Sequence, residues 1–426
     1  MADNILQKSL AVTYEDFLKG VFGKKEKPEW RALMTLFSKI VTGRSTLVCD
    51  LSDSLRENAT ASERKRVQEL VSGWLSRYDF ISETGGWLLK NIPEAAGDAL
   101  TFAIDFSDIS KVFGGRGMEG MSMGRDGSTG DIRMGHDFIC VSLVGKAYPE
   151  ALPVYVKLGK GRGSHDELLQ EAIKKVMERT GGTGWIVEDR GMDAAGHIHV
   201  LKRDERKAVV RVKDMKRDVF GDGRAVDESL RDVPFFDAML SVHSGDRRVK
   251  IRCKPGVIQF CEDPKSKDAV TENVNVLVVE SRFDERSIYL YVVCPDWVLA
   301  IPAQMALYAE RAAQAYCDRW QIETSFFVMK QEFALEKVRV RTFKRLENIF
   351  SLCVLAYVYA TQFLRKTKGF RKILKFLADN LGTVSSKTHA LLAGIRALVK
   401  EARIRFISGR PRKQTVDDRQ MALPGF

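Results

Sequence analysis

The chain lacks the cysteine patterns of disulfide-stapled or zinc-stabilised proteins. Its seven cysteines are scattered over 426 residues, with no C-x-x-C pair and no cysteine–histidine cluster. An odd count without regular spacing argues against a disulfide framework and against a structural zinc site. A composition that is 45% hydrophobic is instead enough to build sizeable cores.

Long apolar segments are also missing. The first residues, MADNILQKSLAVTYEDF, contain no apolar core of the signal-peptide kind. The longest apolar run, 351–364, is too short to span a bilayer comfortably and predicts a buried helix. The glycine-rich run 124–130 lacks the G-K-[ST] ending of a P-loop, so we interpret it as a hairpin turn or a DNA-backbone contact. We therefore expect a soluble intracellular protein without a membrane partner.

Positive charge is what the chain has in excess. Its net charge is +12 and its pI is about 9.3, which favours a polyanionic partner, nucleic acid ahead of membrane. A basic but otherwise ordinary enzyme is the alternative. The segment 364–375 is either a phosphate contact or a solvated helix face, and 408-SGRPRK-413 resembles a minor-groove arm or is a chance basic motif.

The order of elements predicts a mixed α/β protein. Residues 1–97 have helical periodicity, which fits either a helix-turn-helix-like DNA-binding domain or a plain helical bundle. Residues 98–213 combine strand candidates with a helix at 164–180, and the order β-β-β-α-β-α-β fits a ribonuclease H-like core. The strand candidates of this part are 100–108, 138–145, 152–159, 185–190 and 207–213.

The second half divides into a strand-rich part and a helical part. Residues 214–303 predict a β-strand insertion. Residues 304–345 predict a core helix, and residues 346–426 a helical C-terminal region with a basic tail. The strand candidates of the insertion are 248–255, 274–282 and 287–294.

Two aspartates end apolar strand candidates. Asp105 closes 102-FAID-105, where alternation directs it away from the face of Ile104, and Asp189 closes 185-WIVED-189. Aspartate is unfavourable in strands, so each could simply begin a turn. Phosphodiester chemistry with two metal ions, however, needs several carboxylates that rigid elements bring together.

A third carboxylate lies on the helix candidate 315-AYCDRWQIETSFFVMKQEF-333. At about 100° per residue, Tyr316, Arg319, Glu323 and Lys330 share an arc of roughly 60°, which forms one polar edge. A salt-bridged solvent face is the plainer interpretation.

Bulky neighbours argue that this edge borders packed structure, where a lone carboxylate is costly without a partner or a metal. Arg319 and Glu323 have the i,i+4 spacing, but in the weaker orientation. The bulky neighbours are Trp320, Phe326 and Phe327.

The segment 316-YCDRWQIETSFFVMK-330 reads Tyr-x2-Arg-x3-Glu-x6-Lys. It resembles the signature of bacterial insertion-sequence transposases with a DDE catalytic domain, of the insertion-sequence-four type. Upstream, 103-AIDFSD-108 and 187-VEDRGMD-193 resemble the two aspartate strands of that family. The resemblance covers roughly residues 98–364 and is weaker over residues 1–97, where a helical region suits the family's end-binding domain.

The resemblance implies a metal-binding catalytic triad of Asp105, Asp189 and Glu323 that holds two Mg²⁺ or Mn²⁺ ions. Asp108 and Asp193 are rival ligands that follow their apolar strands less directly. The DNA-contacting residues that the resemblance implies are Tyr316, Arg319, Lys330 and Arg211, the last on the strand 207–213.

In relatives, an aromatic residue of the insertion stacks on a base flipped out of the transposon end. Tyr289 is the positional match here, and Trp297 is the nearby alternative. Both also fit core aromatics, which is the interpretation we favour.

The function expected from the resemblance is cut-and-paste DNA transposition. Such an enzyme binds the inverted-repeat ends of an insertion sequence, cleaves them through two-metal chemistry, with a hairpin intermediate, and joins them to target DNA. Its partners would be double-stranded DNA and a second copy of the chain, at the nucleoid in a bacterial cytoplasm. The alternatives are a ribonuclease H-like nuclease without strand transfer, and a non-catalytic DNA-binding protein derived from a transposase.

Overall fold

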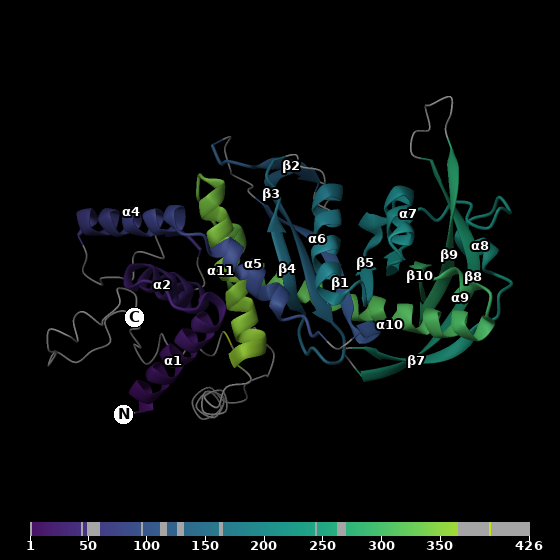
Figure 1. Ribbon diagram of the computed structural model, residues 1–426, viewed down its shortest axis with the longest axis horizontal. Helices are drawn as coiled ribbons and strands as arrows, with labels where there is room; N and C mark the ends of the chain where they lie inside the picture. The colour runs from purple at the N-terminus through teal and green to yellow at the C-terminus, as the bar shows by residue number, and fades with distance from the viewer. Residues whose placement is uncertain are drawn as a thin grey trace.

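The computed structural model describes residues 2–43, 46–48, 60–94, 97–110, 117–125, 132–161, 165–242, 245–261, 270–364 and 392. It is a mixed α/β structure built on one continuous mixed sheet. A helical part lies at one end of the molecule and the longest strands lie at the other (Figure 1). No helix in these described ranges is long and apolar enough to cross a membrane.

The first half of the sheet contains the five strand candidates predicted for the core. β3 lies antiparallel to β1, and β2 and β4 share the outer edge of β3. β1, β5 and β6 run parallel, and β5 is buried along its whole length, as parallel strands covered on both faces are. This arrangement is consistent with a ribonuclease H-like domain. The strands are β1 (Thr101–Ser110), β2 (Ser122–Arg125), β3 (Ile132–Val144), β4 (Leu152–Leu158), β5 (Trp185–Glu188) and β6 (Lys207–Arg211).

The second half continues the same sheet, because β10 pairs antiparallel with β6. The order then runs through β9 and β8 to β7 at the edge. The three strand candidates of this part are confirmed. The sequence did not predict β7, nor the short β2 of the first half, because neither has a long apolar run. The strands are β7 (Phe236–Val242), β8 (Gly245–Cys261), β9 (Thr271–Phe283) and β10 (Arg286–Val293).

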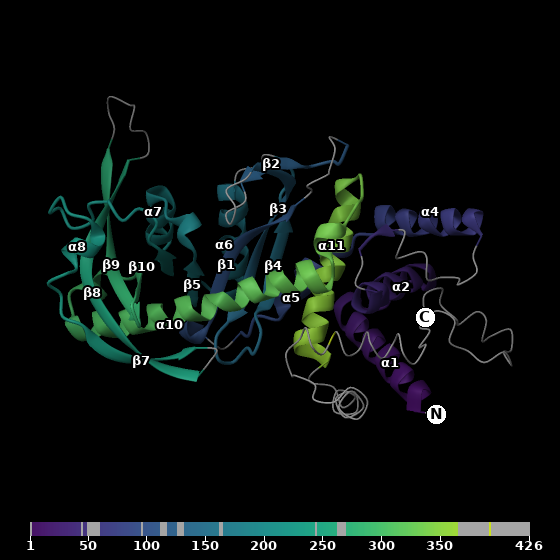
Figure 2. The same ribbon diagram turned by 180° about the vertical axis from the view of Figure 1, so that it is seen from behind.

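Helices cover both faces of the sheet. α6 (His165–Thr180) and α7 (Ala195–Arg203) lie on one face, and α10 (Pro302–Phe327) lies along the other (Figures 1 and 2). Pro302 begins α10, where its fixed φ and missing N–H are tolerated. Four small residues then allow this helix to lie close to the strands. They are the buried Ala309, Ala312, Ala313 and Ala315.

The helix that carries Glu323 is not continuous to Lys330. α10 ends at Phe327 and passes into a π-helical turn, Val328–Glu332. The assumption of one regular helix through Lys330 is therefore wrong, and the polar edge drawn on it ends near Glu323. Beyond a short 3₁₀ turn, α11 (Phe343–Val358) confirms the buried apolar helix predicted near residues 351–364.

Three N-terminal helices pack against α11: α2 (Lys27–Gly43), α4 (Ala61–Arg77) and α5 (Phe80–Lys90). The first helix, α1 (Ala2–Phe22), packs against α2 and α5. α4 begins with a capping box between Thr60 and Glu63, and it ends at Arg77, just before α5 begins at Phe80. Most of residues 44–59, the basic segment beyond Leu364 and the motif 408–413 lie outside the described residues.

One buried amide fastens the turn between α4 and α5 to α11. The side chain of Asn348 accepts a hydrogen bond from the backbone N–H of Phe80 at 2.9 Å. It donates to the carbonyl oxygens of Leu75 and Tyr78 at 2.9 and 2.8 Å. All three backbone groups therefore have Asn348, a residue far away in the sequence, as their hydrogen-bond partner.

We predict that Asn348→Ala lowers the free energy of unfolding of the helical end by about 2–4 kcal/mol, because it leaves three polar backbone groups unpaired. Thermal unfolding and limited proteolysis near residue 80 would measure the loss. Asn91→Ala is the matched control, since its amide makes one 3.3 Å bond and should cost about 1 kcal/mol or less. Equal effects of the two variants would contradict the role of Asn348.

Candidate active site

Parallel pairing brings the two strand-end aspartates to the same edge of the sheet. Ile104 of β1 lies opposite Glu188 of β5, and these are the last paired residues of the two strands. Asp105 and Asp189 follow directly. Because side chains alternate, both aspartates face α10 while Ile104 and Glu188 face the opposite helices.

α10 supplies a third carboxylate and a cation. Arg319 is buried on the sheet-facing side of the helix, at 4% exposure. Its Nη1 lies 3.1 Å from Asp105 Oδ2, and its Nη2 lies 2.6 Å from Glu323 Oε1 and 3.8 Å from Asp189 Oδ1. The three predicted ligands therefore surround one guanidinium.

Arg319 is expected from the resemblance to contact DNA, and this role stays a prediction. In the structure its guanidinium forms a short ion pair with Glu323. Across the described part of the chain, no group of three or more His, Cys, Asp or Glu side chains is arranged to hold a metal ion as it stands. At this site the guanidinium lies between the carboxylates.

Two further residues that the resemblance implied, Tyr316 and Arg211, contact Asp189. The hydroxyl of Tyr316 donates to Asp189 Oδ1 at 3.0 Å. Arg211, at the end of β6, donates to the Tyr316 oxygen at 3.2 Å and lies 3.6 Å from Asp189. Asp189 is thus oriented by a tyrosine and two arginines before any ligand binds.

The two aspartates have opposite electrostatic environments. Burial, opposed by Arg319 and reinforced by the charges of Asp189 and Glu323, raises the pKa of Asp105 to about 7. Burial also acts to raise the pKa of Asp189, but Arg319, the backbone N–H of Arg190 and the Tyr316 hydroxyl outweigh it and lower that pKa. Of the two aspartates, Asp105 is therefore the one whose charged form the surroundings stabilise less.

Lys330 and the rival aspartates have other partners. Lys330, in the π-helical turn, has its Nζ 3.1 Å from Asp108 and 3.4 Å from Glu336. Asp193 has a fully buried side chain that accepts hydrogen bonds from the backbone N–H groups of Lys213 and Asp214 and pairs with Arg217. These contacts fix the loop after β6.

The two aromatic candidates of the strand-rich part lie away from the carboxylates. Leu290 lies opposite Arg211, so alternation directs Tyr289 to the other face of the sheet. Trp297, in α9 (Asp296–Leu299), meets the edge of the Tyr308 ring, two turns before Tyr316 along α10. Their roles in DNA binding stay predictions.

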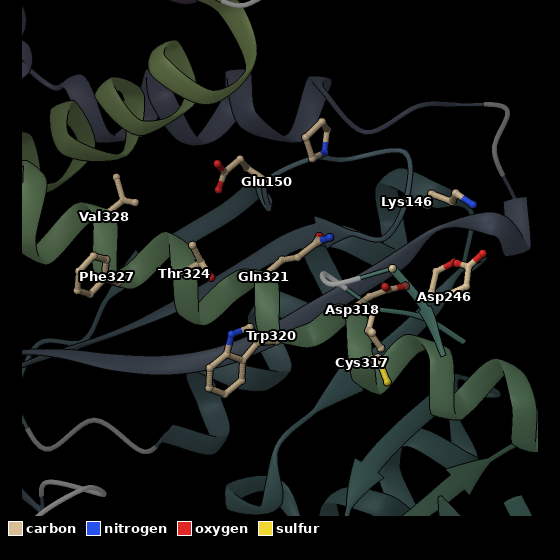
Figure 3. A pocket seen from close by; sticks show the side chains of 14 residues that line it. Lys146, Glu150, Asp246, Cys317, Asp318, Trp320, Gln321, Thr324, Phe327 and Val328 are labelled. Atoms are coloured by element: carbon tan, nitrogen blue, oxygen red, sulfur yellow. The ribbon is translucent and has the colours of Figure 1, made fainter. Parts of the chain in front are cut away.

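Two exposed aromatic residues flank Glu323 instead. Trp320 is 63% exposed and Phe327 is 57% exposed, and both project from the same side of α10 (Figure 3). Of the bulky neighbours taken as a packed border, only Phe326 is buried. On a helical wheel both residues lie within about 60° of Glu323, and this was the sequence feature that placed them near it.

A cavity of about 610 Å³ lies along α10, and Trp320 and Phe327 are among the residues that line it (Figure 3). Lys146, Glu150 and Asp246 line it as well, whereas none of the three clustered carboxylates does.

With the geometry defined, residues 148–359 match the family model described as a transposase DDE domain. The match spans just under half of the chain and supports a DDE transposase. It contains Asp189, Glu323 and Arg319, whereas Asp105 lies upstream of it and is connected to them by the strand pairing. A comparison with curated proteins found no match.

A buried ion pair supports the strand that ends at Asp189. Glu188 is fully buried and accepts a 2.8 Å hydrogen bond from His197 of α7. Burial acts to lower the pKa of His197, but the charge and hydrogen bond of Glu188 outweigh it, so that the pKa is raised. The resulting stability is fully present below the ordinary histidine pKa and is lost as pH rises through the raised value.

We predict that His197→Gln, which keeps a donor for Glu188 but no charge, destabilises the protein most near pH 6, by about 2 kcal/mol. The difference from wild type should shrink as the pH rises toward 9, and thermal unfolding across this range would measure it. His199→Gln is the control because its partner Glu272 is 60% exposed, whereas Glu188 is fully buried. A deficit for His197→Gln that grows with pH would overturn the prediction.

Proposed function

We propose that the chain is a cut-and-paste DNA transposase whose catalytic centre is formed by Asp105, Asp189 and Glu323. The observation that carries the proposal is the convergence of these three carboxylates, from two strands and a helix, on one cationic group. The match to a transposase DDE domain supports the same class.

The donor set fits a hard divalent cation such as Mg²⁺ or Mn²⁺. Carboxylate oxygens are the preferred ligands of these ions, and here a guanidinium already stands where positive charge is stabilised. When bound, a pair of such ions activates the attacking oxygen and stabilises the leaving one. The ligands would be Asp105, Asp189 and Glu323.

The remaining residues of the cluster orient the carboxylates and neutralise negative charge. Tyr316 and Arg211 hold Asp189 in position. Arg211 also brings positive charge beside Asp189, and Lys330 brings it beside Asp108. Phosphate oxygens of the transposon end would bind there. The Tyr-x2-Arg-x3-Glu-x6-Lys spacing supports the insertion-sequence-four type and, with it, the hairpin route.

DNA would extend from the catalytic cluster toward the helical end of the chain. α4 presents the exposed basic run Arg64, Lys65 and Arg66 to solvent, which suits the phosphate backbone. We propose that this helical end binds the inverted repeat, and that cutting two ends in concert requires a homodimer on double-stranded DNA. Such work takes place at the nucleoid in the bacterial cytoplasm.

We predict that Glu323→Gln lowers DNA cleavage by at least about 10³-fold while binding to the terminal repeat changes little, because a neutral amide is a poor metal ligand. The substrate is a labelled duplex carrying the inverted repeat that flanks the coding sequence, with Mg²⁺ added. Glu310→Gln, an exposed change on the same helix, is the control and should cleave normally.

The products of the same assay separate the related functions. Cleavage followed by joining to target DNA supports the transposase, and cleavage alone indicates a nuclease. Binding without cleavage by the wild type indicates a non-catalytic protein. Full cleavage by Glu323→Gln would remove this glutamate from the site.

A further prediction concerns the exposed aromatic residues. We propose that Trp320 and Phe327 stack on bases next to the scissile phosphate, since each flanks Glu323 and is more than half exposed. Either alanine variant should weaken binding to a nicked or single-stranded end about 5- to 100-fold, measured by fluorescence anisotropy. Leu307→Ala removes a similarly exposed apolar side chain elsewhere on α10 and should not weaken binding.

A further inference from the structure

Arg319 uses the oxygen atoms that a metal ion would need. Its two Nη groups donate to Asp105 Oδ2 and Glu323 Oε1, at 3.1 and 2.6 Å. A hydrogen bond and a metal bond compete for the same lone pairs of a carboxylate oxygen. The arginine therefore acts at the ligands themselves and not merely near them.

The position of Arg319 is fixed by the fold. The residue lies on the buried stripe of α10, and its side chain is 5% exposed, against 38% for Arg211. Its Nε is buried and has no hydrogen-bond partner among the described residues, so one donor of the guanidinium stays unused. Its guanidinium also lies over the Tyr316 ring, 5.3 Å from the centroid.

The charges of the cluster favour replacing the Arg319 guanidinium by metal ions when DNA binds. Three carboxylates and the guanidiniums of Arg211 and Arg319 leave one net negative charge. Two divalent ions would turn this into three positive charges in a partly buried site, which is unfavourable unless anions enter or an arginine leaves. A phosphodiester backbone supplies the anions, and it is also a strong partner for a freed guanidinium.

We infer that Arg319 is a built-in competitor of the metal ions: it closes the ligand cluster in free protein and moves to a DNA phosphate when the substrate binds. DNA and metal then bind cooperatively, because each favours the state in which Arg319 has left the carboxylates. This inference rests on the proposed function, since it takes the three carboxylates as metal ligands. Its consequence is that free enzyme is poorly loaded with metal away from its DNA.

The test is a Mn²⁺ titration of the full-length protein without DNA, followed by electron paramagnetic resonance of the free ion. Arg319→Gln should bind Mn²⁺ about tenfold or more tightly than wild type. Arg211→Gln removes the same charge from the same cluster but leaves Arg319 on Asp105 and Glu323, so its affinity should rise much less. Arg203→Gln, on the exposed surface of α7, controls for net charge and should bind as wild type does.

A second arm adds the terminal-repeat duplex, with Mn²⁺ bound by the duplex alone subtracted. The duplex should tighten Mn²⁺ binding by wild type about tenfold and leave Arg319→Gln nearly unchanged. Should Arg319→Gln fail to fold, Arg319→Lys keeps the charge but not the two-pronged contact, and it should still bind Mn²⁺ more tightly than wild type without DNA.

The outcomes are distinct. Equal or weaker Mn²⁺ binding by folded Arg319→Gln, or equal gains for Arg211→Gln, would overturn the competition while leaving the metal site intact. Wild type that binds Mn²⁺ equally well with and without DNA would overturn the coupling. Absence of Mn²⁺ binding in every variant would remove the metal site, and with it the proposed function.

Discussion

The parallel pairing of β1 with β5 is the constraint on which the site depends. It brings Asp105 and Asp189, which are far apart in the sequence, to adjacent strand ends on the same face. A shift of one residue in this pairing would turn one aspartate toward α6 and α7 and leave its charge without a cation. The buried pair of Glu188 and His197 anchors the opposite face of the same strand end, so packing on one side positions chemistry on the other.

α10 provides the second constraint, because its small residues bring charged ones close to the sheet. The alanines before Tyr316 let the helix axis approach the strands, so the next residues on that face, Tyr316 and Arg319, reach the aspartates directly. A buried arginine is stable only when several anions surround it. The carboxylates and the arginine therefore stabilise one another: three partly exposed carboxylates balance the buried guanidinium of Arg319.

Local patterns in the sequence predicted most of the strands and the helix that carry this arrangement. Those patterns alone left Asp105 and Asp189 as possible turn residues and Glu323 on a possible solvent face. The resemblance of the surrounding segments to transposase motifs was what singled out the three residues. The pairings were not predictable, because a helical wheel assumes an unbroken helix and gives angles without partners. Lys330 lies in the π-helical turn after Phe327, with its Nζ near Asp108, and nothing in the composition of residues 328–332 marks this turn. Likewise, the wheel places Trp320 and Phe326 about 60° to either side of Glu323, and it does not tell which of them is covered.

The role that we infer for Arg319 follows from its position on α10 and from the charges around it. A guanidinium at this position satisfies the carboxylates when the protein is alone, and it prevents them from repelling one another inside a partly buried site. The same property makes it an obstacle once divalent ions must occupy those oxygens. An enzyme that cuts DNA gains from such an obstacle, because an exposed, fully loaded metal site would hydrolyse any strand that it meets. If phosphate is what draws the arginine away, then correct docking of the DNA assembles the catalytic centre, and recognition and chemistry are coupled through one side chain.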